Sequence, residues 1–320
     1  MIRKILVPMD GSALAETALP QAVAVARACQ AEVGLLRVLD TNGAKAGRLV
    51  DSVSWRLART AASRSLEALA AKLAAQGVRV RWSVAEGDAA EEILRRSREE
   101  AVDLVVLCSH GKSGPSGFGL GSTSQKVLSR AGASVLVVRG AEPPAEMPAE
   151  ARFPLILVPL DGSQRSQWAL LQAVPLARAS GSEILLVHVV APPLLSGRTP
   201  PTPEEVELTR QMSERDRRSA EIYLRELQEL LAGSGLQART RLVESPQIVQ
   251  TLLKIAGDEK AALIVVSAHG CSGAAPWPYG SVTDRLIHHG TVPLLVLQDL
   301  SFRAPGAGEE AALAATIVSV

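Results

Sequence analysis

The chain contains the same sequence pattern twice, in the same order. The segment Ile5–Ser12, ILVPMDGS, returns as Ile156–Ser163, ILVPLDGS, and the His110–Ser122 segment, which begins with His-Gly and ends with Gly-Ser, returns as His269–Ser281. The repeat distance of about 150 residues exceeds the roughly 20–50 residues of a solenoid unit and is the length of a whole domain. The sequence therefore predicts a duplicated domain, and the residues that both copies share are the candidate functional residues.

Composition places the chain among globular proteins and excludes several function classes. With 320 residues, 47% of them hydrophobic and 21% charged, it is long enough for two ordinary cores. The net charge of +1 gives no electrostatic reason to expect nucleic acid or an acidic membrane as a partner. The three cysteines, Cys29, Cys108 and Cys271, are far apart and form no CxxC pair, which favours a reducing compartment over a disulfide framework or zinc site. With no signal-like start and no apolar run of the ~18 residues that a membrane span needs, we expect a cytoplasmic protein.

Each repeat reads as five strands that alternate with four helices. In repeat 1 the strands are predicted at 2–7, 32–39, 78–84, 104–107 and 134–138, and the helices at 12–28, 53–75, 88–100 and 122–130. In repeat 2 the strands are predicted at 155–158, 183–189, 238–243, 263–266 and 293–297, and the helices at 164–179, 204–231, 247–257 and 281–289. This alternation predicts an α/β fold with two tandem, doubly wound, Rossmann-like parallel sheets. The first and fourth strands of each sheet are the most apolar, so we expect them to be central.

The domain boundaries follow from composition. Residues 1–140 are predicted to form domain 1, residues 141–153 a proline-containing linker, and residues 154–300 domain 2. Residues 301–320 form an Ala/Gly-rich tail that we expect to be frayed, with a stray strand over 313–320 as the alternative. Repeat 2 is about eight residues longer, and the proline-rich segment 191–203 is predicted to hold the extra length.

Two loops in each repeat are candidates for a ligand site, because ligands of open parallel sheets bind beyond the carboxyl ends of the strands. One loop, Pro8–Ser12, follows the first strand, and the other, His110–Ser122, follows the fourth. The second loop ends in Gly-Ser at a predicted helix N-terminus, where free N–H groups and the helix dipole favour phosphate. Glycine there permits a close approach of the backbone to a ligand.

The spacing within the second loop is the same in both repeats. It reads Cys108-x2-Gly111-x9-Gly121-Ser122 in repeat 1 and Ser267-x2-Gly270-x9-Gly280-Ser281 in repeat 2. With Val-Pro-x-Asp-Gly-Ser after the first strand, this pattern resembles the universal stress protein family in its tandem form, over nearly the whole chain except linker and tail. Nucleotide-binding members of that family carry glycine at the first position too, whereas here Cys108 and Ser267 stand in its place.

The resemblance implies an adenine-nucleotide alpha-hydrolase-like fold with ATP or AMP, with or without Mg²⁺, bound in each repeat. The end of the first strand would approach adenine and ribose, the valine ending the second strand would line the adenine slot, and the glycine loop would hold the phosphates. The residues so implied are Pro8, Met9, Asp10, Val38, Gly111, Gly121, Ser122 and Thr123 in repeat 1, and Pro159, Leu160, Asp161, Val189, Gly270, Gly280, Ser281 and Val282 in repeat 2.

Structural explanations exist for several of these residues. Asp10 and Asp161 are also suited to capping the turn into the first helix, since Asp-Gly-Ser is common turn chemistry. Gly121 with its following serine is also an ordinary helix start. For His110 and His269 no partner ligand has a fixed spacing, so we expect structural hydrogen bonding, and no metal ligand or catalytic residue is assigned.

Three functions remain open. The first is a nucleotide-binding stress-response regulator that is not an enzyme, because no base or nucleophile is evident beside the phosphate loop. The second is a nucleotide-free interaction module of the same fold. The third is an adenylyl-transfer enzyme of a related superfamily, which the absence of His-x-Gly-His and Ser-Gly-Gly-x-Asp-Ser disfavours. The sequence identifies no protein partner.

The two repeats are expected to differ in ligand preference. The loop of repeat 1 carries Lys112 and additional glycines, whereas that of repeat 2 has Cys271 at the matching place, the stiff segment Pro276–Pro278, and no Lys or Arg from Gly270 to Gly280. We therefore expect repeat 1 to be the one that favours ATP.

The final strand of each repeat is apolar and has no charged residue to protect it. An exposed sheet edge of this kind is an aggregation liability that proteins normally cover. We therefore expect the strands at 134–138 and 292–297 to pair within one chain, with a homodimer through the remaining edges left open.

Overall fold

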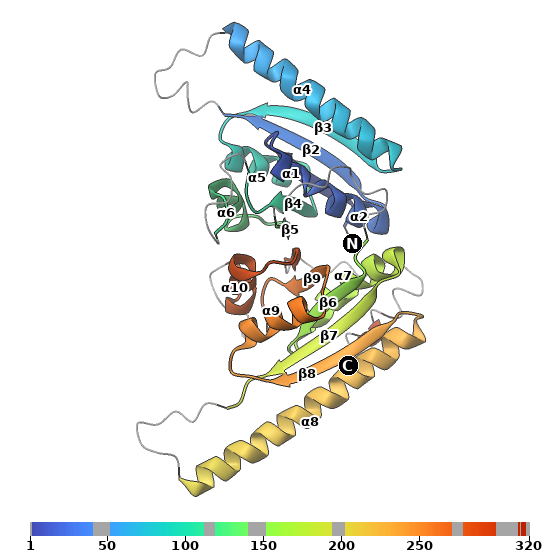
Figure 1. Cartoon of the computed structure of the whole chain (residues 1–320), viewed down its shortest axis with the longest axis vertical. Coiled ribbons are helices and arrows are strands. Elements are labelled where there is room, and N and C mark those ends of the chain that lie inside the picture. The colour runs from blue at the N-terminus through green and yellow to red at the C-terminus, as the bar shows by residue number, and fades with distance from the viewer. Residues whose placement is uncertain are drawn as a thin grey trace.

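The computed structural model describes residues 2–40, 52–111, 119–139, 152–193, 202–270, 278–298, 313 and 315–317. Within these residues, strands alternate with helices in both repeats, and all the strands join one sheet (Figure 1). The α/β class, the two tandem halves and the mostly parallel strands are confirmed.

Repeat 1 supplies five strands and the helices that connect them. Its strands are β1 (Lys4–Met9), β2 (Glu32–Leu39), β3 (Arg79–Glu86), β4 (Leu104–Cys108) and β5 (Ser134–Val138). Its helices are α1 (Ala13–Glu16), α2 (Leu19–Cys29), α4 (Ser52–Ala75), α5 (Ala89–Glu99) and α6 (Ser122–Leu128).

Repeat 2 has the same order. Its strands are β6 (Leu155–Leu160), β7 (Glu183–Val190), β8 (Ala238–Glu244), β9 (Leu263–Ser267) and β10 (Leu294–Leu297). Its helices are α7 (Gln164–Ser180), α8 (Pro203–Gly233), α9 (Ile248–Asp258) and α10 (Ser281–His289).

The strand order across the sheet is β3-β2-β1-β4-β5-β10-β9-β6-β7-β8. Pairs within each half are parallel, and the halves meet through the antiparallel pair β5–β10, in which Leu295 lies opposite Leu136. The expected pairing of the two final strands is therefore confirmed. Within each half the first strand is central, with the fourth strand beside it, as the apolar sequences predict.

Helices cover both faces of the sheet, because successive strand residues point to opposite sides. On one face α2, α4, α7 and α8 bury an apolar layer that is continuous across both repeats, and on the other face α5, α6, α9 and α10 do the same. Polar contacts also cross the junction: Arg139 donates from its guanidinium to the carbonyl of Ile287 near the end of α10, and the backbone N–H of Gln298 donates to Ser134 Oγ at 3.2 Å.

The helix predicted over 12–28 is wrong as a single element, because it is divided into α1 and α2. Pro20 lies in the first turn of α2 and has no N–H with which to continue the hydrogen bonds of α1. The hydroxyl of Thr17 instead donates to the Leu14 carbonyl at 2.6 Å and closes α1. Repeat 2 keeps one helix, α7, in spite of Pro175 within it.

The extra length of repeat 2 lies in a helix, so its assignment to 191–203 is wrong. The segments between strand and helix, 40–51 and 191–202, are equally long. Helix α8, in contrast, has 31 residues where α4 has 24. The prolines suggested an insertion in the segment between β7 and α8. The additional residues instead follow the prolines and extend α8 at its N-terminus.

The expected linker, 141–153, lies outside the described residues except for Arg152 and Phe153, and Phe153 is buried. Of the tail, the described residues are helical, which contradicts a strand over 313–320. Leu313 and Ile317 belong to the same apolar layer as α2 and α8. The described part of the tail therefore packs on the core, where we had expected it to be frayed.

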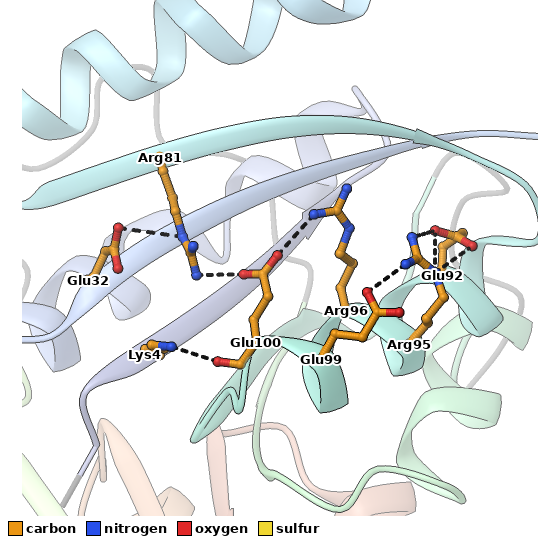
Figure 2. A network of polar contacts seen from close by, with 8 residues as sticks. All are labelled: Lys4, Glu32, Arg81, Glu92, Arg95, Arg96, Glu99 and Glu100. Atoms are coloured by element: carbon orange, nitrogen blue, oxygen red, sulfur yellow. Dashed lines mark hydrogen bonds and ion pairs between the residues drawn. The ribbon is translucent and has the colours of Figure 1, made fainter.

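An ion-pair network ties the amino ends of the strands to α5 in repeat 1 (Figure 2). Arg81 of β3 bonds Glu100 at 2.5 Å and approaches Glu32 of β2 at 3.5 Å, while the Lys4 ammonium donates to the Glu100 carbonyl at 2.8 Å. In repeat 2, Glu259 takes the equivalent place and accepts from two arginines of β8. Because these pairs are partly exposed to solvent, each contributes about 0–1 kcal/mol and mainly fixes geometry at the sheet edge opposite the strand-end loops.

Candidate functional site

The carboxyl ends of β1 and β4 lie side by side, because the two strands pair in parallel. This brings Asp10, just after β1, against Gly111, just after β4. The Asp10 Oδ1 atom accepts from the Ser12 backbone N–H at 2.8 Å and from the Ser12 hydroxyl at 2.6 Å, and a Cβ atom placed on Gly111 would collide with Asp10 Oδ2. The Ser12 hydroxyl also accepts from the Ala15 N–H at 3.1 Å and caps α1. Asp10 thus performs the turn capping that the sequence suggested.

Repeat 2 reproduces this arrangement. Asp161 Oδ1 accepts from the Ser163 N–H at 3.0 Å and from its hydroxyl at 2.5 Å. A Cβ atom placed on Gly270 would lie 2.5 Å from Asp161 Oδ2. Both predicted loops therefore meet at one sheet edge in each repeat, with the carboxylate against the loop glycine.

The two glycines of each loop have different reasons for being glycine. At Gly111 and Gly270 the neighbouring carboxylate leaves no room for a side chain. At Gly121 and Gly280 the backbone is ordinary, with φ of −60° and −69°, and an added Cβ would meet its nearest described atoms at 3.4 and 3.5 Å. Those are normal van der Waals distances or close to them, so the described fold does not require glycine at Gly121 or Gly280.

Gly121 and Gly280 are the N-caps of α6 and α10, and neither helix has a side-chain cap. The backbone N–H groups at the start of each helix, from Ser122, Thr123, Ser281 and Val282, therefore lie at a helix end that has no capping side chain among the described residues. One residue further on, Ser124 Oγ donates to the Cys108 carbonyl at 2.9 Å, and Thr283 Oγ1 donates to the Ser267 carbonyl at 2.9 Å. Sequence reasoning missed these hydroxyls, which join each helix start to the fourth strand.

The remaining predicted residues lie at the same edge. Pro8 and Pro159 are half-buried, and Met9 and Leu160 are buried in the layer beneath α2 and α7, so only the backbone of Met9 and Leu160 is available to a ligand. Val38 and Val189 pack against the opposite layer, at equivalent positions of β2 and β7.

The side chains that replace the first motif glycine are held by their own repeat. Cys108 Sγ lies 3.7 Å from the Thr17 hydroxyl, and the Ser267 hydroxyl donates to the His269 carbonyl at 2.7 Å. The intervening loop residues 112–118 and 271–277, which include Lys112, Cys271 and Pro276, lie outside the described residues.

Arg37 is a site residue that sequence reasoning missed. Arg37 lies opposite Met9 in the pairing of β1 with β2. Its guanidinium lies against Gly11, and its Nη1 donates a hydrogen bond to the Met9 carbonyl at 3.4 Å. Burial lowers the pKa of Arg37 from its ordinary value, and the nearby Asp10 carboxylate opposes that shift. The sequence feature that could have identified Arg37 is its position immediately before Val38, near the end of a strand that leads to the candidate loops.

In repeat 2 the position of Arg37 is taken by His188, opposite Leu160. Burial lowers the pKa of His188, Asp161 partly opposes the shift, and the ring stacks edge-on with Tyr223 at 6.5 Å between centroids. A cation comes from another element instead, since Arg165 in the first turn of α7 donates to the Gly270 carbonyl at 3.2 Å. The absence of Lys or Arg from the loop sequence therefore does not leave repeat 2 without a nearby positive charge.

His110 forms the structural hydrogen bond that was expected, between its Nδ1 and Ser109 Oγ at 3.1 Å. Its Nε2 is buried and has no hydrogen-bond partner within the part of the chain that the structure describes, and the same holds for Nε of Arg37 and Nδ1 of His188. Across the described residues, no three His, Cys, Asp or Glu side chains gather as a metal site would require. In the same part of the chain, none of the helices combines the length and the apolarity needed to cross a bilayer.

Comparison with known proteins agrees with this geometry. The sequence model described as the universal stress protein family matches residues 1–139 and 153–298. The universal stress protein YxiE of Bacillus subtilis is 34% identical over 149 residues, which are 43% of this chain and all of that protein. A universal stress protein of Mycolicibacterium smegmatis is 29% identical over 233 residues, 69% of this chain and 70% of that one.

Among solved structures, a universal stress protein from Archaeoglobus fulgidus has the same fold, with a TM-score of 0.63, 21% identity, and coverage of 92% of this chain and 98% of the other. The matched segments fall on the two repeats, each with its strand-end loops. The chain therefore belongs to the universal stress protein family, in the form that carries two of its domains in tandem.

Proposed function

We propose that each repeat binds an adenine nucleotide, ATP or AMP, at its strand-end loops, and that the chain is a cytoplasmic stress-response regulator and not an enzyme. The observation that carries the proposal is the open backbone at Gly121 and Gly280. Glycine stands there although the described fold would accept a side chain, and the position is a helix N-terminus at the end of the same loop whose first glycine contacts the carboxylate of Asp10 or Asp161. A ligand that approaches the backbone supplies the missing reason for glycine.

Phosphate is the ligand group that suits the helix starts. The N–H groups that follow Gly121 and Gly280 carry the positive end of the helix dipole, which stabilises an anion by about 0.3–1 kcal/mol, and up to ~2 kcal/mol when partly buried. Arg37 adds a full positive charge near the site of repeat 1, and Arg165 adds one near that of repeat 2. Asp10 and Asp161 are left to accept from ribose hydroxyls or the adenine amine, in keeping with the family resemblance.

Unpaired buried polar atoms near the loops also support a polar ligand. Nε2 of His110, Nε of Arg37 and Nδ1 of His188 have no hydrogen-bond partner among the described residues. A buried donor or acceptor without a partner costs about 1–3 kcal/mol, which a ligand or its bound water would offset. One carboxylate per repeat, together with nucleotide phosphates, is a donor set that also fits Mg²⁺.

The chemistry of the loops favours binding over turnover. The carboxylate that follows the first strand of each repeat is already held by two hydrogen bonds from the serine two residues further on. A general base has to be free to take a proton from the attacking group. We therefore assign the site to retention of a nucleotide, whose presence other proteins would sense.

The preference of repeat 1 for ATP is kept as part of the proposal. Repeat 1 has Arg37 next to its carboxylate and Lys112 in its loop sequence, whereas repeat 2 has Arg165 and, at the place of Arg37, His188, which burial keeps neutral. A permanent positive charge favours the more highly charged triphosphate.

Calorimetric titration of the full chain with ATP and AMP tests this function. Gly121→Val blocks backbone approach in repeat 1 and Gly280→Val does so in repeat 2, so each single variant isolates the other site. Gly132→Val is the matched control, because a Cβ there meets nothing within 4 Å and the residue precedes β5 at the opposite sheet edge. We expect loss of one site in each single variant, loss of both in the double variant, and an unchanged control. Unchanged ATP affinity in the double variant would contradict the site.

A further inference from the structure

The N-terminal part of helix α8 extends well beyond the sheet. Helix α4, its counterpart in repeat 1, starts close to the sheet. In repeat 1, Trp55 and Arg59 near the start of α4 both bond Glu86, the last residue of β3, at 3.2 Å. In repeat 2 the equivalent contact with Glu244, the last residue of β8, comes from Arg217 at 3.8 Å. The fourteen-residue segment 203–216 therefore precedes the point where α8 meets the sheet, and extends about 21 Å at 1.5 Å per residue. We call this segment the arm.

The arm is a well-formed helix that contributes nothing to the core. Its N-terminus is fixed by a capping box, in which Thr202 and Glu205 exchange hydrogen bonds. No residue of the arm is buried, and the first buried residue of α8 is Ala220. Figure 1 shows the arm projecting past the carboxyl ends of the strands, on the side of the candidate nucleotide sites. The helix thus continues for several turns without an interaction within the described chain that would explain its length.

Exposed apolar side chains follow a heptad stripe along this helix. Leu208 and Met212 are 59% and 47% exposed, and Ile222, further along α8, is 54% exposed. With Arg215 and Ser219 between them, these residues are spaced by alternating steps of four and three, which is the a/d pattern of a coiled coil. The buried residues of α8 lie on a different face, so the stripe remains accessible.

Charge is segregated along the arm. Its first turns hold Glu204, Glu205 and Glu207, whereas residues 210–218, which run just past the arm, hold four arginines with Glu214 and Asp216 among them and are basic on balance. An antiparallel copy of the same helix would place the acidic turn of one chain beside the basic turns of the other. The acidic first turns and the basic stretch that follows them are therefore complementary to each other in charge, and a self-complementary surface is what a two-fold dimer uses.

We propose that the arm pairs with the arm of a second copy of this chain, as a short antiparallel coiled coil. Placing Leu208 opposite Met212 of the partner subunit fixes the register. In that register Glu205 lies opposite Arg215 of the partner subunit. Beside the stripe, Glu204 lies next to Arg218 of the partner subunit. One register thus satisfies both the apolar pair and the charge pairs.

The pairing is small, since it involves only about four helical turns from each chain, and we expect a weak dimer that depends on concentration. Because the arms project from the carboxyl edge of the sheet, the dimer holds the candidate nucleotide sites of the two chains on facing sides of the contact. The inference itself rests on α8 alone and does not depend on nucleotide binding.

Sedimentation of the full chain over a range of micromolar concentrations tests the proposal. Glu204→Arg makes both flanking pairs in the dimer arginine against arginine, and Arg218→Glu makes both glutamate against glutamate. We expect each variant to weaken dimerisation by about tenfold or more. An equimolar mixture of the two variants restores opposite charges at both pairs, so we expect a mixed dimer close to wild-type affinity.

Arg210→Glu is the matched control, because Arg210 lies on the helix face away from the stripe while, like Arg218, it pairs with a glutamate of its own chain: Arg210 with Glu207 at 2.8 Å and Arg218 with Glu214 at 3.0 Å. We expect it to leave dimerisation unchanged. A wild-type chain that stays monomeric at every concentration would overturn the proposal, as would single variants that dimerise normally. A mixture that dimerises no better than its components would overturn it too, since a general loss of folding cannot be repaired by mixing.

Discussion

Gly111→Ala should destabilise the protein because of one contact, that between the new Cβ and the Asp10 carboxylate. The added atom would collide with Oδ2 and lie 3.2 Å from Cγ of Asp10. Overpacking of this kind costs about 1–3 kcal/mol. Turning the carboxylate away would break its hydrogen bonds from Ser12, at 2.8 and 2.6 Å, which are worth about 0.5–1.5 kcal/mol each. Both routes lead to a loss of about 1–3 kcal/mol.

A double-mutant cycle isolates this contact. In an Asp10→Ala background the carboxylate is gone, so Gly111→Ala should cost less than about 0.5 kcal/mol, giving a coupling energy of about 1–3 kcal/mol. The free energies are measured by urea denaturation of the full chain followed by circular dichroism. The same cycle at Asp161 and Gly270, where the collision distance is 2.5 Å, is an independent replicate within the same molecule.

Gly121→Ala is the control for glycine replacement in the same loop. Its φ is −60° and its nearest contact would be 3.4 Å, so we expect a change in stability within about 1 kcal/mol. If Gly111→Ala costs the same with and without the Asp10 carboxylate, then that contact is not the reason for glycine, and the distinction between the two loop glycines is refuted.

Three further predictions follow from the site and the junction. Burial lowers the pKa of His188, so the unfolded chain takes up a proton at this residue more readily than the folded chain as the pH falls below about 6.5. The free energy of unfolding should therefore decrease over that pH range. His188→Gln should flatten that part of the pH profile in urea titrations. Cysteines at Leu136 and Leu295, which lie opposite each other, should crosslink within one chain when the native cysteines are serine, and crosslinks that form only between chains on a gel would disprove the junction. Arg165→Ala, made in the Gly121→Val background, should weaken ATP binding at repeat 2 by about two- to tenfold in calorimetry, and an unchanged affinity would remove Arg165 from the site.

The duplication made most of the fold readable from the sequence. The apolar, uncharged runs that end each repeat predicted that β5 and β10 would pair, because an uncovered edge of that composition is unfavourable. The helix over 12–28 was predicted as one element because its apolar periodicity is uninterrupted. Pro20 divides it, whereas Pro175 does not divide α7. Local sequence does not decide between these outcomes, since packing against the sheet stabilises either form.

The site was predictable where the chain repeats itself and unpredictable where it does not. Asp10, Gly111 and Gly121 were found because each has a counterpart at the same place in repeat 2. Arg37 was missed because its counterpart is His188, and Arg165 because no cation in repeat 1 corresponds to it. Such contacts depend on which strands and helices the strand order places next to each other. From sequence alone, an arginine is interpreted as a solvated surface residue.

Release of bound small molecules tests the central claim most directly. Wild-type protein purified under mild conditions, then denatured and analysed by mass spectrometry, should release adenine nucleotide, and the Gly121→Val/Gly280→Val double variant prepared in parallel should release none. Gly132→Val should release as much as the wild type, since a Cβ there has open space. A wild-type chain that releases no adenine nucleotide and gives no heat on titration with millimolar ATP or AMP would contradict the account, and would favour a nucleotide-free interaction module built on the same fold.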